Sequence, residues 1–76
     1  MQMEFMKSRF LYAKARESNN QWQIGNLLTN KDTRLDKAIL DYLLLQREPF
    51  LRFDLIREIG NDAFQHLIDN RIIIPQ

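Results

Sequence analysis

Residues 33–46 read TRLDKAILDYLLLQ, and the order of their apolar residues predicts an α-helix. Apolar side chains recur at i, i+3, i+4, i+7 and i+8, the spacing of one helical face, at Leu35, Ala38, Ile39, Tyr42 and Leu43. A second apolar row, Leu40 and Leu44, lies beside this face. Since so much apolar surface must be covered on more than one side, we expect the other segments to pack around this central helix.

Both ends of the central helix carry local signals. Thr33 and Asp36 have the [ST]-x-x-[DE] spacing of a capping box, which starts a helix. Pro49 moves the preceding Glu48 out of the α region, so the helix should end by about Arg47. The predicted range of the central helix is therefore about 33–47.

The composition favours helices joined by short connections. The chain has 76 residues, two glycines, two prolines and no cysteine, so no disulfide or thiolate metal site can stabilise it. A chain this short forms one domain. We expect a single all-α domain over residues 1–76, a compact bundle of four to five short helices around the central helix. The single tryptophan, Trp22, is expected to be a core anchor in a short helical patch over 22–28.

Residues 3–17 allow two interpretations. Similar residues recur seven apart, as in Phe5 and Tyr12 or Lys7 and Lys14, which favours a helix that packs on the core with basic side chains along its edges. A basic amphipathic helix that contacts a membrane surface or an acidic partner is the alternative role for this helix. The run Phe10-Leu11-Tyr12 also suits a strand, so a β-hairpin using residues 9–16 stays open.

Residues 51–76 resemble a helix-turn-helix that runs toward a wing. Apolar stripes predict helices over 51–59 and 62–70. Gly60 should end the first helix, Asn61 should cap the second, and Asn70 should take a left-handed position after it. Residues 72–74 should then be extended or form a last half-turn. A DNA-reading helix needs donors near its start, whereas this one offers Asp62, Gln65, His66 and Asp69. We therefore favour two packed core helices and do not expect nucleic acid as a partner. The alternative function is a DNA-binding regulator, or a phage-type inhibitor that acts by protein contact.

No residue pattern indicates catalysis. His66 is the single histidine and lies on the expected exposed side of its helix, and Asp62 and Asp69 lack the pattern of a metal-binding loop. None of the common phosphate-binding, dinucleotide-binding or zinc-protease motifs occurs. We expect a protein that is not an enzyme and has no metal or cofactor.

Basic residues supply the candidate interaction face. They are Lys7, Arg9, Lys14, Arg16, Arg52 and Arg57, which could form one surface if the first and fourth helices are neighbours. Such a face would suit an acidic protein partner or an anionic membrane surface. The net charge of only +1 gives no strong overall field. With no secretory signal and no apolar run of spanning length, the expected location is the cytoplasm.

Two stretches, MEFMKSRFLYAKARESNNQW (3–22) and FDLIREIGNDAFQHLIDNRIIIPQ (53–76), prompt a comparison with a known family. In length, absence of cysteine and expected five short helices, the chain is similar to the PAS factor of Vibrio species. The resemblance implies a secretion accessory factor that promotes release of periplasmic proteins, and hence action on the periplasm. It assigns no individual functional residue.

Overall fold

The computed structural model describes residues 3–18 and 20–76, and for residues 16–18 the backbone alone. Within these residues it shows three helices and two antiparallel sheets, so the prediction of an all-α bundle is wrong. The strands are β1 (Glu4–Lys7), β2 (Leu11–Ser18), β3 (Gln21–Asn26), β4 (Lys31–Asp36), β5 (Phe50–Leu51) and β6 (Ile73–Pro75). The helices are α1 (Lys37–Leu45), α2 (Arg52–Ile59) and α3 (Asn61–Asp69).

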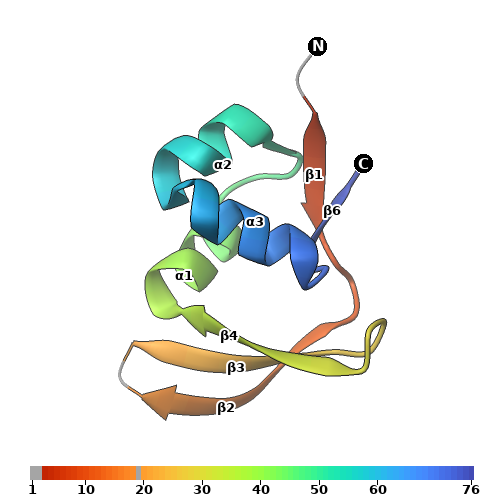
Figure 1. Ribbon diagram of the computed structural model, residues 1–76, viewed down its shortest axis with the longest axis vertical. Coiled ribbons are helices and arrows are strands. Elements are labelled where there is room, and N and C mark those ends of the chain that lie inside the picture. The colour runs from red at the N-terminus through yellow and green to blue at the C-terminus, as the bar shows by residue number, and fades with distance from the viewer. Residues whose placement is uncertain (1–2, 19) are drawn as a thin grey trace.

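Sheet B is a meander of consecutive strands in the order β2-β3-β4. Tyr12 pairs with Gly25 between β2 and β3, and Ile24 pairs with Thr33 between β3 and β4. The alternation along β4 follows from this pairing, since Thr33 and Leu35 are buried and their neighbours are exposed. Sheet B lies at one end of the molecule in Figure 1.

The helix predicted over 3–17 is wrong, because this segment forms β1 and β2. A repeat of seven keeps similar residues on one face of a helix, but seven is odd and does not match the two-residue period of a strand. Phe5 is accordingly 2% exposed, whereas its counterpart Tyr12 is 44% exposed. The hairpin interpretation was closer, although β2 pairs with β3 and not within residues 9–16.

The helical patch predicted over 22–28 and the capping box at Thr33 are also wrong. Trp22 lies in β3, half-buried against the core. Asp36 ends β4 and makes no capping bond to α1; its Oδ1 accepts a hydrogen bond from Gln21 Nε2 across the sheet at 3.1 Å. The central helix therefore starts at Lys37, four residues later than expected. Its end at Leu45 agrees with the predicted limit.

Sheet A joins three strands from distant parts of the chain, in the order β5-β1-β6. Phe5 of β1 pairs with Phe50 on one side and with Pro75 on the other. The first and last described strands therefore lie side by side, as Figure 1 shows. The pairing extends to Gln76, whose N–H donates to Glu4 O at 2.9 Å.

The helices predicted in the second half are confirmed as α2 and α3. Gly60 separates them with φ 88°, a left-handed conformation that glycine adopts without strain. The left-handed residue after α3 is Arg71 (φ 57°) and not Asn70, and Gly60, not Asn61, occupies the N-cap position of α3. Of the two forms predicted for residues 72–74, the structure shows the extended one at Ile73 and Ile74, which lie in β6, while Ile72 precedes the strand.

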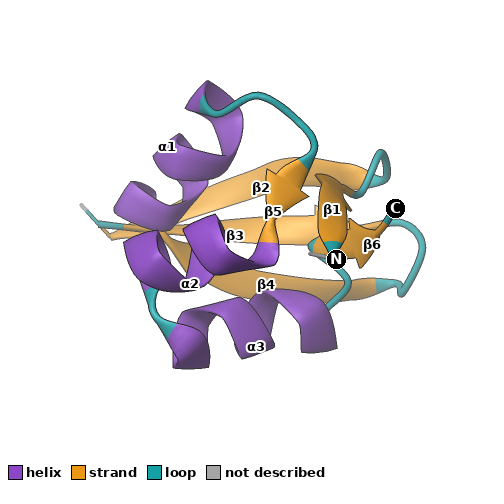
Figure 2. Ribbon diagram, turned by 90° about the horizontal axis from the view of Figure 1, so that it is seen from above, coloured by secondary structure: helices purple, strands orange, loops and turns teal. Residues whose placement is uncertain are grey.

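One core unites the two sheets and the three helices. Its most deeply buried side chains come from every layer and include Phe5, Leu35, Leu43, Leu55, Leu67, Ile72 and Ile73. Phe5 of sheet A packs edge-on against Phe64 of α3, with ring centroids 5.4 Å apart. Seen from above in Figure 2, α1 lies toward the β2 side of sheet B and α3 toward the β4 side.

Candidate functional site

Helix α1 is covered by the core on one face only. Leu43 points into the core and is 1% exposed, whereas Leu44 is 61% exposed and Leu45 is 81% exposed. The expectation that other segments cover both apolar rows of this helix is therefore wrong for Leu44, whereas Leu40 of the same row is half-buried against the core. These exposed apolar side chains make this side of α1 a candidate for contact with another molecule.

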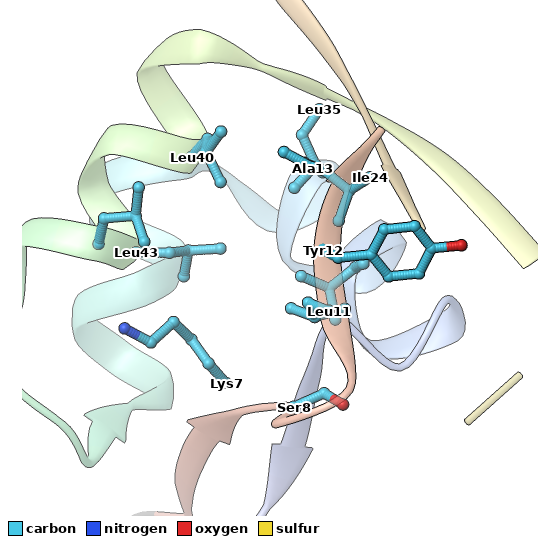
Figure 3. Close-up of a pocket in the computed structure, with 11 residues that line it drawn as sticks. Lys7, Ser8, Leu11, Tyr12, Ala13, Ile24, Leu35, Leu40 and Leu43 are labelled. Atoms are coloured by element: carbon cyan, nitrogen blue, oxygen red, sulfur yellow. The ribbon is translucent and has the colours of Figure 1, made fainter. Parts of the chain in front are cut away.

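The second row of α1 forms one wall of an apolar groove. Leu40 and Leu43 face Leu11 and Ala13 of β2 across the groove, as Figure 3 shows. Leu44 also lines the groove, whose volume is about 300 Å³. Ile24, Leu35 and Ile72 complete the lining from the core side. Leu44 and Ala13, on opposite walls, are both exposed, so the groove is open to solvent.

Few polar groups border the groove. Lys7 lies at one end of it, with the Nζ atom 3.4 Å from Glu48 Oε1. Ser8 is buried and already bonded, since its Oγ accepts from Phe10 N–H at 3.2 Å and its own N–H donates to Ile72 O at 2.9 Å. The groove can hold apolar groups and offers one cation at its end, but it presents no nucleophile with a base beside it.

The candidate basic residues of the first segment lie in different surroundings. Lys7 lines the groove. Arg9 is exposed in the turn before β2. Lys14 lies 2.8 Å from Asp32 Oδ2, and this hydrogen bond and the carboxylate charge raise the pKa of Lys14 above its ordinary value. The backbone of Arg16 pairs with Trp22, while its side chain lies outside the described part of the structure.

The two candidate residues of the second half belong to α2. Arg52 stacks over the Phe64 ring, with its guanidinium carbon 5.6 Å from the centroid. Arg57 contacts two acidic neighbours, Asp54 at 3.1 Å and Glu58 at 3.9 Å. Since β2 and α2 lie at opposite ends of the molecule in Figure 1, the structure does not bring Lys14 together with Arg52 and Arg57.

Helix α3 presents an acidic surface. Asp62, Gln65 and Asp69 are exposed, and Gln65 Nε2 donates to Asp69 Oδ1 at 2.9 Å. His66 is exposed too, with Nε2 3.4 Å from Arg34 O and Nδ1 3.2 Å from Asn70 Nδ2. The histidine thus connects α3 to the backbone of β4. Among the described residues, no three His, Asp or Glu side chains are grouped to hold a metal ion.

Tyr42 lies on α1 where this helix approaches α2. Burial raises the pKa of Tyr42 above its ordinary value, and the negative charges of Glu58 and Asp54 raise it further. The phenol therefore stays neutral throughout the physiological range. Tyr42 is half-buried against the core and does not line the groove.

Sequence reasoning missed the groove, although part of its signal was visible. The second apolar row of α1 was recognised, but it was assigned to the core. The opposite wall, Leu11 and Ala13, was assigned to a helix, and only the pairing of β2 with β3 brings it to α1.

The comparisons with known proteins identify no relative. No family model matches the chain, and no match is found among curated proteins or solved structures. Within the described residues, no helix is both long and apolar enough to span a membrane.

Proposed function

We propose that this chain is a small non-enzymatic protein that binds a protein partner through the groove between α1 and β2. The observation that carries the proposal is Leu44, an apolar side chain 61% exposed on the wall of an apolar groove. Exposed apolar surface of this kind is costly in water and is retained where a partner covers it.

Photo-crosslinking tests this proposal directly. A photoreactive amino acid at position 44 is expected to give discrete adducts with a partner in the cells that make the protein. The same amino acid at Gln65, exposed on the acidic surface of α3, serves as the matched position and is expected to give none. Equal adducts at both positions, or none at position 44, would overturn the proposal.

The resemblance to the PAS factors supports a more specific form of the proposal, in which binding promotes release of periplasmic proteins. Expression of the chain should then raise periplasmic marker enzymes in the medium without a rise in a cytoplasmic marker. Leu44→Asp should abolish this release. Leu28→Asp replaces a leucine of similar exposure, 57% against 61%, outside the groove and should leave it unchanged. Markers that stay in the cell fraction at normal expression would rule out the secretion role.

DNA binding is not part of the proposal. The two helices are present as the helix-turn-helix interpretation requires, but α3 carries Asp62 and Asp69 on its exposed surface. Phosphate contacts supply much of the affinity in DNA complexes, and carboxylates repel phosphate.

A further inference from the structure

Strand β2 has an unpaired edge. It is the outermost strand in the order β2-β3-β4 and pairs only with β3 among the described residues. Phe10 O accepts a hydrogen bond from Leu27 N–H at 2.9 Å, which sets the phase of the ladder. Bonded and non-bonded pairs alternate in an antiparallel ladder, so Tyr12 exchanges bonds with Gly25 while the N–H and C=O groups of Leu11 and Ala13 point away from β3.

The unpaired edge and the apolar groove share the same residues. The side chains of Leu11 and Ala13 line the groove, and their backbone groups belong to the free edge of the sheet beside it. A segment that paired with β2 would form backbone hydrogen bonds to these two residues. Every second side chain of the segment would then enter the space between β2 and α1, as in recognition by strand addition.

Charge distinguishes between the occupants that could pair with this edge. Residues 4–18 contain four basic residues, Lys7, Arg9, Lys14 and Arg16, against two acidic ones, Glu4 and Glu17. Two of the basic side chains also contact acidic residues outside this segment, Lys7 with Glu48 and Lys14 with Asp32. A second copy paired antiparallel through β2 would bring two net basic segments together, which is unfavourable. Lysine on an edge strand is a known protection against self-pairing. An acidic segment meets attraction at the same edge.

We propose that β2 and α1 bind an extended acidic segment of a partner protein, which adds to sheet B as a fourth strand beside β2. This inference rests on the proposed function and names the chemistry of the partner. Apolar side chains of the segment would contact Leu44 and Ala13, and a carboxylate at one end would meet Lys7. Because Glu48 now pairs with Lys7, it competes for that contact.

The test uses two blocked nine-residue peptides, one alternating glutamate with valine and one alternating lysine with valine. Titration followed by amide NMR is expected to show binding of the acidic peptide, weakening as salt is added. The lysine peptide should bind at least about tenfold more weakly, since like charges would then face each other. The amides of Leu11 and Ala13 should gain protection from hydrogen exchange while that of Tyr12 stays unchanged.

Matched variants of the protein sharpen the test. Leu44→Asp should weaken binding of the acidic peptide at least about tenfold, because it places a carboxylate on the groove wall, whereas Leu28→Asp should not change it. Glu48→Gln should strengthen binding by freeing Lys7. Circular dichroism spectra of the variants identify any that fail to fold. Ala13→Leu fills the groove without removing a buried group, so it provides a second means of blocking peptide binding.

Four outcomes would overturn the inference. Absence of binding by the acidic peptide excludes this class of partner, and equal binding of both peptides excludes the role of charge. Binding without protection of Leu11 and Ala13 excludes strand addition. A dimer of the protein alone that protects these amides would make a second copy the occupant. In the first three cases, photo-crosslinked adducts from position 44 would still support partner binding at the groove, so the two proposals can fail separately.

Discussion

The two sheets of this protein are built in opposite ways. Sheet B joins three consecutive strands through short turns, so each pairing is local in sequence. Sheet A joins β1, β5 and β6, whose pairings span more than forty residues of chain from Phe5 to Phe50. Local pairings cost less chain entropy to form than distant ones. The local sheet, sheet B, supplies the edge strand β2 that lines the groove. Sheet A instead brings together strands from the beginning, middle and end of the chain, so it depends on the fold of the whole domain.

Phe5→Ala should give the largest effect, since it removes the buried centre of sheet A. The loss of a buried phenylalanine costs about 3–5 kcal/mol, against a total stability of about 4–11 kcal/mol for a domain of this size. Denaturation followed by Trp22 fluorescence, which reports on sheet B, and by helical circular dichroism should shift together. If the fluorescence transition stayed in place, sheet B would be stable without sheet A, and the single core would be disproved.

Asn26→Ala should give the next largest effect, because this side chain connects sheet B to the turn before β6. Asn26 is 2% exposed; its Nδ2 donates to Arg71 O at 3.2 Å and its Oδ1 accepts from Leu28 N–H at 2.9 Å. Leaving such groups unpaired costs about 1–3 kcal/mol, measurable by urea denaturation. Asn30→Ala, at an exposed turn position, puts alanine at a positive φ that asparagine tolerates better, and it serves as the comparison for the turn itself. Equal small effects would show that Asn26 does not connect the two regions.

Gly25→Ala tests the pairing within sheet B. A Cβ on Gly25 would overlap the Tyr12 ring, which lies directly across from it. We expect a loss of about 1 kcal/mol, at the low end for overpacking, because Tyr12 is 44% exposed and can turn outward. Tyr12→Ala combined with Gly25→Ala should show less than the sum of the two single losses. Additive losses would mean that ring and glycine are not in contact.

Alkaline pH provides the smallest effect. The pKa values of Lys14 and Tyr42 are both raised from ordinary values of 10.5 and 10.0, so the folded state holds these protons longer than the unfolded chain. Their contribution to stability is complete below the ordinary values and is lost as pH rises through the raised ones. Urea midpoints between pH 9 and pH 11 should fall less in Tyr42→Phe, and less again when Lys14→Met is added. An unchanged slope in the double variant would assign the alkaline loss to other groups.

The second half of the chain was predicted closely because its signals act over short distances. The stripe of Phe64 and Leu67 and the glycine at position 60 define α3 and its start without reference to the rest of the molecule. The first half was predicted wrongly because the same residues, such as Phe10-Leu11-Tyr12, suit a helix or a strand. The alternation of Trp22 with Ile24 and of Thr33 with Leu35, on either side of a polar turn, was the available sign of a hairpin.

The candidate site divides in the same way. The surplus of apolar surface on α1 is visible in residues 33–46, but that Leu44 stays exposed while Leu43 is buried depends on what packs against the helix. The basic residues were identified as an interaction face, and the structure places Lys7 in the groove while Lys14 and Arg57 contact acidic neighbours. No sequence pattern marks the free edge of β2.

By itself, the sequence determined the bodies of α1, α2 and α3 and the end of α1 before Pro49. Only the tertiary structure decided that the first half of the chain forms the strands β1 to β4, that distant strands close the core, and that α1 and β2 face each other across a groove. The physical reason is where the backbone hydrogen bonds go. A helix satisfies them within four residues, so its pattern is local, whereas a strand depends on partners that the surrounding chain must supply.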